Sequence, residues 1–206
     1  MKTTLLNVGK RYNATTIIEN FNYSFEEGNR YALLGGNGSG KSTLIKIISG
    51  VLSPNHGTVS YFRNKNEIPR ELVYKEISFA APYINLILDY NLLELVSFHF
   101  SIKPLNESLT IDEIPAILHL EEHQTKPLKQ YSSGMLQRVK LGLSILANTS
   151  LLLLDEPTTN LDANGEDWYR GLIDRFSQAK TIVVCSNHRS GEYSFCDEEL
   201  NMENYK

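Results

Sequence analysis

The chain alternates between two spacings of hydrophobic residues, one that predicts strands and one that predicts helices. Stretches rich in β-branched and aromatic residues, bounded by turn residues, predict strands at 3–8, 17–25 and 30–34, within 52–62, and at 76–81 before Pro82. The runs SLLLLDEP (150–157) and TIVVCS (181–186) are continuously apolar, which is typical of strands in a sheet covered on both faces.

Apolar positions three and four residues apart predict helices between these strands, at 41–50 with Gly50 as the cap, within 89–129, after Ser132, and at 164–179. The tail at 198–206 is expected to add at most one edge strand. Strands that alternate with helices predict an α/β fold whose mostly parallel sheet binds its ligand at the strand carboxyl ends. The helical block at 89–129 is expected to be an inserted subdomain.

Composition narrows the class of protein. The 206 residues carry a net charge of −4, and no run of five Lys or Arg occurs, so no nucleic-acid partner is expected. The two cysteines, Cys185 and Cys196, lack the spacing of a metal or redox site, and Cys185 is expected in the core. The first residues lack a signal-peptide pattern, and no apolar run approaches the ~20 residues that cross a bilayer. The sequence therefore predicts a soluble, cytoplasmic protein.

The segment GGNGSGKS, after a predicted strand and before a predicted helix, fits the P-loop pattern G-x-x-x-x-G-K-[ST]. Its glycines let backbone N–H groups close around phosphates, and Lys41 adds a positive charge for the β- and γ-phosphates. The Ser42 hydroxyl is a ligand for Mg²⁺. The predicted nucleotide-binding residues are Gly35, Gly36, Asn37, Gly38, Ser39, Gly40, Lys41, Ser42 and Thr43.

Two acidic residues follow the apolar run of 151–154. Asp155 is expected to hold Mg²⁺, directly or through water. Glu156 is expected to point the other way in an extended chain and to polarise the attacking water.

A second polar turn, Ser132-Ser133-Gly134, opens the helix that carries Gln137 and Arg138. Free N–H groups and the positive end of the helix dipole make such a turn an anion site. The chain therefore contains two predicted anion sites far apart in sequence.

With both sites in order, YSSGMLQR followed by LLLLDEPTTNLD resembles the ATP-binding subunit of ABC transporters over nearly the whole chain. The resemblance implies one domain, 1–206, with a P-loop NTPase fold, an N-terminal antiparallel β subdomain and an inserted helical subdomain at about 85–130. It implies ATP and Mg²⁺ as cofactors, an ATPase activity coupled to transport, and separate transmembrane permease subunits that hold the chain at the inner face of the membrane.

In this family the turn that corresponds to Ser132-Ser133-Gly134, called here the signature turn, caps the γ-phosphate of ATP bound to a second copy. This arrangement explains why one chain carries two anion sites. The resemblance implies a head-to-tail dimer in which Ser132 and Gly134 contact the partner's nucleotide. It also implies that Tyr12 stacks on adenine, that His188 contacts the γ-phosphate, and that Asp162 belongs to the loop at the dimer interface. Lys41, Glu156 and His188 are the predicted catalytic residues.

The sequence departs from the family pattern at two places. Pro82 follows the strand after which the family usually has Gln, and Tyr83, Asn85 or no residue takes that place. In the signature, Tyr131, Ser133 and Met135 replace the usual Leu, Gly and Gln, and Ser133 fits only if its φ is not positive. These changes predict slow turnover more than loss of ATP binding.

Three functions agree with these observations. The favoured one is the motor subunit of a transporter, and its compact length suggests export, with import as the other direction. The alternatives are a soluble ABC ATPase that acts on ribosomes or in DNA repair, and a nucleotide-dependent regulator with little turnover. The absence of a charged linker and of a coiled-coil insertion argues against the first alternative, and the pair Asp155-Glu156 argues against the second.

Overall fold

The computed structural model describes residues 1–205 and divides them into two compact units. Unit 1 comprises Met1–Phe79, Ser150–Glu156 and the chain from Ala179 onward, and unit 2 comprises Ala80–Thr149 and Pro157–Gln178. No helix of the described chain is long and apolar enough to span a membrane.

The first sheet of unit 1 is antiparallel and has the strand order β2-β1-β4-β5. Its strands are β1 (Lys2–Tyr12), β2 (Thr15–Phe25), β4 (His56–Arg63) and β5 (Asn66–Glu67). The first strand is longer than the hydrophobic pattern indicates, because its polar end at 9–12 pairs with β2. This sheet confirms the expected antiparallel β subdomain.

The second sheet has the order β6-β7-β8-β3-β9, and its β7–β8, β8–β3 and β3–β9 pairs are parallel. Its strands are β6 (Ile77–Ala80), β7 (Leu151–Asp155), β8 (Thr181–Ser186), β3 (Arg30–Leu34) and β9 (Glu198–Asn201). Every residue of β7 and β8 is buried, as their apolar runs predict. The tail forms the edge strand β9, as expected.

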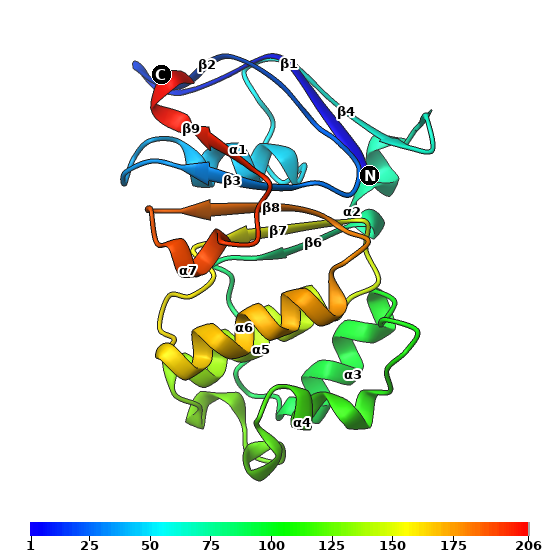
Figure 1. The fold of residues 1–206 in the computed structure, drawn as a ribbon. Helices are drawn as coiled ribbons and strands as arrows, with labels where there is room; N and C mark the ends of the chain where they lie inside the picture. Colours follow the sequence, from blue (N-terminus) through cyan, green and yellow to red (C-terminus); the bar gives the residue numbers. More distant parts are fainter. Residues whose placement is uncertain (206) are drawn as a thin grey trace. The chain divides into compact units, whose positions relative to one another are not determined.

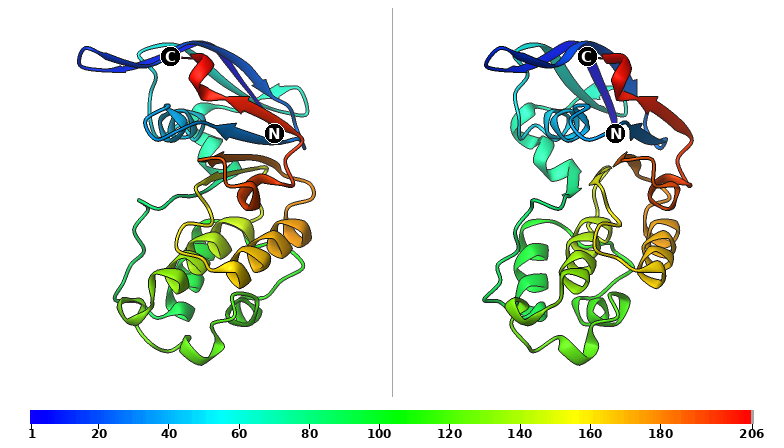
Figure 2. Two further views of the ribbon diagram at one scale, coloured as in Figure 1. Left: turned by 60° about the vertical axis from the view of Figure 1, so that its left-hand side comes forward. Right: turned by 90° about the vertical axis from the view of Figure 1, so that its left-hand side faces the viewer.

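Helix α1 (Lys41–Ile48) packs on β7 and β8 and lies between the two sheets of unit 1 (Figures 1 and 2). The core there joins β1 and β2 side chains with those of α1, β7 and β8. The C-cap of helix α1 is Ser49, one residue before the predicted cap Gly50. Gly50 follows the cap with φ +76°. The remaining helices of unit 1 are short: η1 (Arg70–Leu72), α2 (Val73–Glu76), α7 (Ser190–Tyr193) and η5 (Met202–Tyr205).

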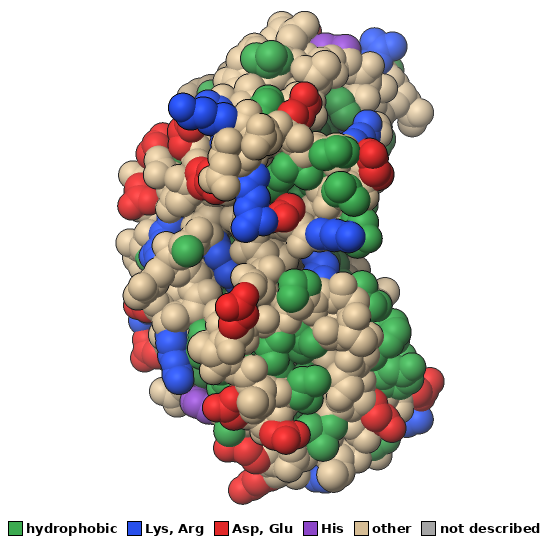
Figure 3. Space-filling view, turned by 90° about the vertical axis from the view of Figure 1, so that its right-hand side faces the viewer, with side chains coloured by type: hydrophobic (Ala, Val, Ile, Leu, Met, Phe, Trp, Pro, Cys, Tyr) green, Lys and Arg blue, Asp and Glu red, His purple; other side chains and the backbone are tan. Residues whose placement is uncertain are grey.

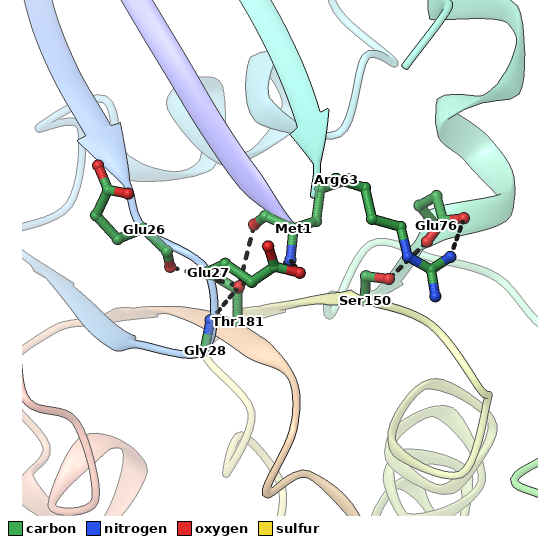
Figure 4. Close-up of polar contacts among 8 residues, drawn as sticks. All are labelled: Met1, Glu26, Glu27, Gly28, Arg63, Glu76, Ser150 and Thr181. Atoms are coloured by element: carbon green, nitrogen blue, oxygen red, sulfur yellow. Dashed lines mark hydrogen bonds and ion pairs between the residues drawn. The ribbon is translucent and has the colours of Figure 1, made fainter. Parts of the chain in front are cut away.

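Polar contacts join the two sheets at the amino ends of β7 and β8 (Figure 4). The Thr181 hydroxyl accepts hydrogen bonds from the α-amino group of Met1 and from the N–H of Gly28. Glu76 pairs with Arg63 at 3.0 Å and accepts a hydrogen bond from the Ser150 hydroxyl. These contacts therefore lie at the ends of β7 and β8 opposite to Glu156 and Asn187, which follow the two strands.

Unit 2 is helical, and α5 (Ser133–Ile145) and α6 (Ala163–Phe176) lie side by side in it (Figures 1 and 2). Its other elements are α3 (Leu92–Ile102), η2 (Ile111–Glu113), α4 (Ile114–Ile117), η3 (Glu121–His123) and η4 (Leu128–Gln130). The expected helical block at 89–129 thus contains one helix of 11 residues, the four-residue helix α4 and short 3₁₀ turns. Gly142 of α5 has no room for a side chain, since an added Cβ would lie 2.2 Å from Leu118.

Candidate active site

The P-loop lies in unit 1, between the end of β3 and the start of α1. Gly35, Gly38 and Gly40 have φ values of +151°, +78° and +97°, which glycine adopts at low cost. A side chain on Gly40 would also lie 3.2 Å from the carbonyl oxygen of Ile17. The tight turn before α1 therefore depends on glycine at this position.

Lys41 is 4% exposed, and its ammonium group folds back onto the loop. Nζ donates to the carbonyl oxygens of Gly35 at 2.6 Å and Gly36 at 3.0 Å. It also donates to Oδ1 of Asn187 at 2.6 Å. The buried positive charge is therefore held by three acceptors at the site where the sequence predicts phosphate.

Asn187, which the sequence pattern did not mark, links the parts of this site. Its Nδ2 donates to Oδ1 of Asn37 and to Oε1 of Glu156, both at 2.8 Å. The signal that points to it is its position, because it directly follows β8, the neighbour of both β3 and β7. The carboxyl ends of adjacent parallel strands meet at one sheet edge, so the residue after β8 is brought to the P-loop and the acidic pair.

The acidic pair departs from the expected geometry. Asp155 ends β7 and is 2% exposed, but Glu156 has φ +45° and is not extended. The sequence predicts an extended chain at Glu156, and this prediction is wrong. A left-handed residue closes the strand, while its N–H donates to the Cys185 carbonyl at 2.9 Å and its carboxylate accepts from Asn187.

A cavity of about 200 Å³ lies over the P-loop. Its wall is formed by Ile17, Asn37, Gly38, Ser39, Gly40, Lys41, Ser42, Thr43 and Glu156.

Burial raises the pKa of the Cys185 thiol on β8, and the carboxylates of Asp155 and Glu156 add to the effect. Cys185 is thus a buried, protonated core residue, as its sequence context predicts.

Oxygen donors at the start of α1 and at the end of β7 suit Mg²⁺. Ser42 presents a hydroxyl at the start of α1, and Asp155 presents a buried carboxylate. Within residues 1–205 no group of three or more His, Cys, Asp or Glu side chains forms a metal site. Few protein ligands are what Mg²⁺ needs when water and phosphate oxygens complete its shell.

Tyr12 and His188 lie outside the described wall of this cavity. Tyr12 ends β1 opposite Thr15, is 48% exposed, and has the Lys10 ammonium 5.3 Å from its ring centre. The same hairpin carries Ile17, which does line the cavity. His188 is exposed and has φ +63°.

The signature turn belongs to unit 2, where Ser132 caps α5 by accepting a hydrogen bond from the Met135 N–H at 3.2 Å. Ser133 is the first helical residue and is not among the residues with positive φ, so serine fits there. A side chain on Gly134 would lie 3.0 Å from the carbonyl oxygen of Asn160. Tyr131 is buried, and its hydroxyl donates to the His123 carbonyl at 2.8 Å.

Two further contacts fix the segment that follows the acidic pair in unit 2. Gln137 of α5 is 3% exposed and donates to the Pro157 carbonyl at 2.8 Å. Asp162 caps α6, because its Oδ1 accepts from the Gly165 N–H at 2.8 Å. Asp162 therefore has a local structural role besides the one that the resemblance implies.

The segment at Pro82 is also in unit 2. The Pro82 carbonyl accepts a hydrogen bond from Lys140 of α5 at 2.9 Å. Tyr83 and Asn85 are both exposed, so neither is distinguished as the replacement for the missing Gln.

Comparison with known proteins agrees with this geometry. The model of the ABC transporter family matches residues 18–159. An uncharacterized ABC transporter ATP-binding protein of Bacillus subtilis, YybJ, is 31% identical over 96% of this chain and 91% of its own. The lantibiotic transport ATP-binding protein SrtF of Streptococcus pyogenes is 32% identical over 88% of this chain and 78% of its own.

Two other matches are an import protein and a cassette solved with its hydrolysis products. The spermidine/putrescine import ATP-binding protein PotA of Fusobacterium nucleatum is 30% identical over 77% of this chain and 43% of its own. A solved ATP-binding cassette, dimeric and bound to ADP and Pi after hydrolysis, has a TM-score of 0.80. It is 23% identical over 98% of this chain and 95% of its own, and at that identity it shows the fold alone.

The P-loop, the acidic strand end and the signature turn thus occur in the order and structural context of one family, whose model covers most of the chain. The chain belongs to the ABC transporter family, as an ATP-binding subunit with ATPase activity.

Proposed function

We propose that the chain is the motor subunit of an ABC exporter and works as a head-to-tail dimer with separate membrane subunits. The observation that carries this proposal is the cavity over the P-loop, whose wall includes Lys41 and Glu156. Asn187 joins these two residues by hydrogen bonds. The single domain of residues 1–206 would include both units, with the helical subdomain at about 85–130.

The proposed chemistry needs positioning and charge neutralisation more than covalent steps. Lys41 and the N–H groups of residues 35–43 would bind the phosphates, and Tyr12 would stack on the adenine. Ser42 and Asp155 would hold Mg²⁺, which neutralises charge on the phosphate oxygens. Glu156 would orient or deprotonate the attacking water, and His188 would stabilise the γ-phosphate.

The signature turn would complete the site of a second copy. Ser132 is exposed at the start of the 13-residue helix α5, where the helix dipole favours an anion. Ser132 and Gly134 would contact the γ-phosphate that the partner holds. ATP would then favour the closed dimer by its differential affinity for the closed and open states.

Exposed apolar side chains in unit 2 support a membrane partner. Tyr83, Ile87, Leu88, Phe98 and Ile102 are each between 41% and 60% exposed. Hydrophobic side chains are visible on the face drawn in Figure 3. We propose that transmembrane permease subunits cover part of this surface and hold the chain at the inner face of the membrane, in the cytoplasm.

A role with nucleic acid is not proposed, since the net charge is −4.

The relatives include a lantibiotic transport protein and the import protein PotA at 32% and 30% identity, so the direction of transport has to be measured. The direct test is reconstitution with the membrane subunit that co-purifies with the tagged chain from detergent extracts. In inside-out vesicles, ATP outside should drive substrate inward for an exporter. Uptake by right-side-out vesicles with ATP inside, or co-purification with ribosomal proteins alone, would contradict the proposal.

A regulator with weak turnover is the second candidate, and Pro82 in place of Gln is the observation that favours it. It predicts a phosphate release rate well below the ordinary ~1–10³ s⁻¹ range, even with the membrane subunit present. A rate near the top of that range would exclude it.

A further inference from the structure

The amide of Asn187 uses every hydrogen-bonding atom that faces the P-loop site. Oδ1 accepts from Lys41, and the two Nδ2 protons serve Asn37 and Glu156. The chemistry matches at each end, since an ammonium group only donates and an ionised carboxylate only accepts. Asn187 therefore connects the predicted phosphate ligand to the predicted base.

Lys41 is also fully used. An ammonium group has three protons, and Lys41 donates to three acceptors, namely Gly35, Gly36 and Asn187. A phosphate oxygen that binds Nζ must replace one of them. Two of the acceptors are backbone carbonyls of the loop itself, so the Asn187 side chain is the acceptor that can rotate away at the lowest cost.

The backbone beneath Asn187 is held by its neighbours. The Ser186 hydroxyl accepts from the Arg189 N–H at 3.1 Å and bonds to the carboxylate of Glu192, which is 1% exposed. His188, which lies between Ser186 and Arg189 in sequence, has a φ of +63°. The turn is thus fixed by Ser186 and Glu192, whereas the described hydrogen bonds of the Asn187 side chain all go to residues of the P-loop site.

We propose that Asn187 is a positioning residue that competes with nucleotide phosphate for Lys41 and restrains Glu156 until phosphate displaces it. In the ligand-free protein the amide keeps the base attached to the P-loop. When phosphate takes Lys41, Asn187 loses its strongest partner, and Glu156 is released toward the attacking water. This inference rests on the proposed roles of Lys41 and Glu156.

The test measures the affinity for ADP and for a non-hydrolysable ATP analogue by calorimetry, together with kcat. Asn187→Ala should bind both ligands about 10- to 100-fold more tightly, because a hydrogen bond to a charged group no longer has to be broken. Its kcat should not fall, because Glu156 has already left the Asn187 amide when phosphate is bound to Lys41. Asn22→Ala, at an exposed asparagine of β2 in the same unit, should change neither quantity.

A merely structural role of Asn187 would weaken nucleotide binding, so unchanged or weaker binding by Asn187→Ala overturns the inference. A second measurement uses the wild-type chain: the side-chain amide resonance of Asn187 should shift when ADP is added, and a resonance that stays in place also overturns it. Lys41→Ala distinguishes failure of the inference about Asn187 from failure of the proposed nucleotide site. If the wild-type chain binds ADP and Lys41→Ala does not, the proposed site stands whatever Asn187→Ala shows.

Discussion

The P-loop of unit 1 and the signature turn of unit 2 are both anion sites, yet they differ in how their polar groups are satisfied. Lys41 is buried and makes three hydrogen bonds within unit 1, two of them to the loop itself. Ser132 is exposed, and its described hydrogen bonds all go to the first turn of its own helix, from the N–H groups of Met135 and Leu136. In the first site the hydrogen bonds of the Lys41 ammonium group are satisfied before any ligand arrives. The second site offers N–H groups to an anion that another molecule must bring.

Because of this difference, variants can separate the two sites experimentally. A change in the P-loop site should alter nucleotide binding by a single chain. A change in the signature turn should leave that binding intact and alter only association between chains. The following variants test this division.

The largest effect is expected from Glu156→Gln, which keeps an oxygen acceptor for the Asn187 amide but removes the base. We expect phosphate release to fall by about 10²–10⁴-fold, the usual contribution of general base catalysis, with ADP affinity unchanged. Light scattering with MgATP should show accumulated dimer. Glu199→Gln, on the exposed face of β9, is the matched control. A monomer at all MgATP concentrations would argue against the sandwich dimer for the isolated subunit.

Lys41→Ala should come next, because it removes the buried charge that phosphate needs. Binding of ADP is expected to weaken by about 100-fold, equivalent to roughly 3 kcal/mol for a charge-assisted contact. Calorimetry measures the affinity, and Lys46→Ala on the same helix is the control. Equal affinity for both variants would mean that the phosphates do not bind at Lys41.

Unit 2 should respond to acid through His99 on α3. Burial lowers the pKa of His99 to about 4, and the charge of Lys103 adds to the effect. Between pH 6.5 and 4 the unfolded chain therefore binds more protons at this residue than the folded chain, so stability falls as pH falls. Between pH 7 and 5 the loss is expected to be about 2 kcal/mol.

Denaturant unfolding at several pH values checks this expectation. In His99→Gln the curve of unfolding free energy against pH should be flatter below pH 6.5. If wild type and variant lose the same free energy between pH 7 and 5, His99 is not the group responsible.

The smallest effect is expected from Ser132→Ala, which removes the cap of α5 at a cost of about 1 kcal/mol in stability. ADP affinity of the single chain should stay the same, whereas the dimer formed in a Glu156→Gln background should weaken. Asn91→Ala removes the cap of α3 in the same unit and is the control for lost stability. If both variants weaken the dimer equally, the effect comes from stability and not from contact with the partner's nucleotide.

Much of the fold follows from residues that are local in sequence. The apolar runs at 151–154 and 181–185 are buried strands because few other environments accept such runs. The glycines at 35, 38 and 40 specify the P-loop because their φ values are positive. Helix lengths within 89–129 did not follow, since α3 is the only described helix there longer than four residues and the rest consists of α4 and short 3₁₀ turns.

What the sequence by itself determined is the presence of each motif: a P-loop, an acidic strand end and a signature turn, in the order of one family. The tertiary structure alone decided how they are connected. Glu156 takes a left-handed φ that a strand pattern does not predict, and Asn187 joins Lys41 to Glu156 across 146 and 31 residues of chain. The physical reason is that parallel strands distant in sequence end at one sheet edge, so the partner of a buried charge is chosen by the topology of the sheet.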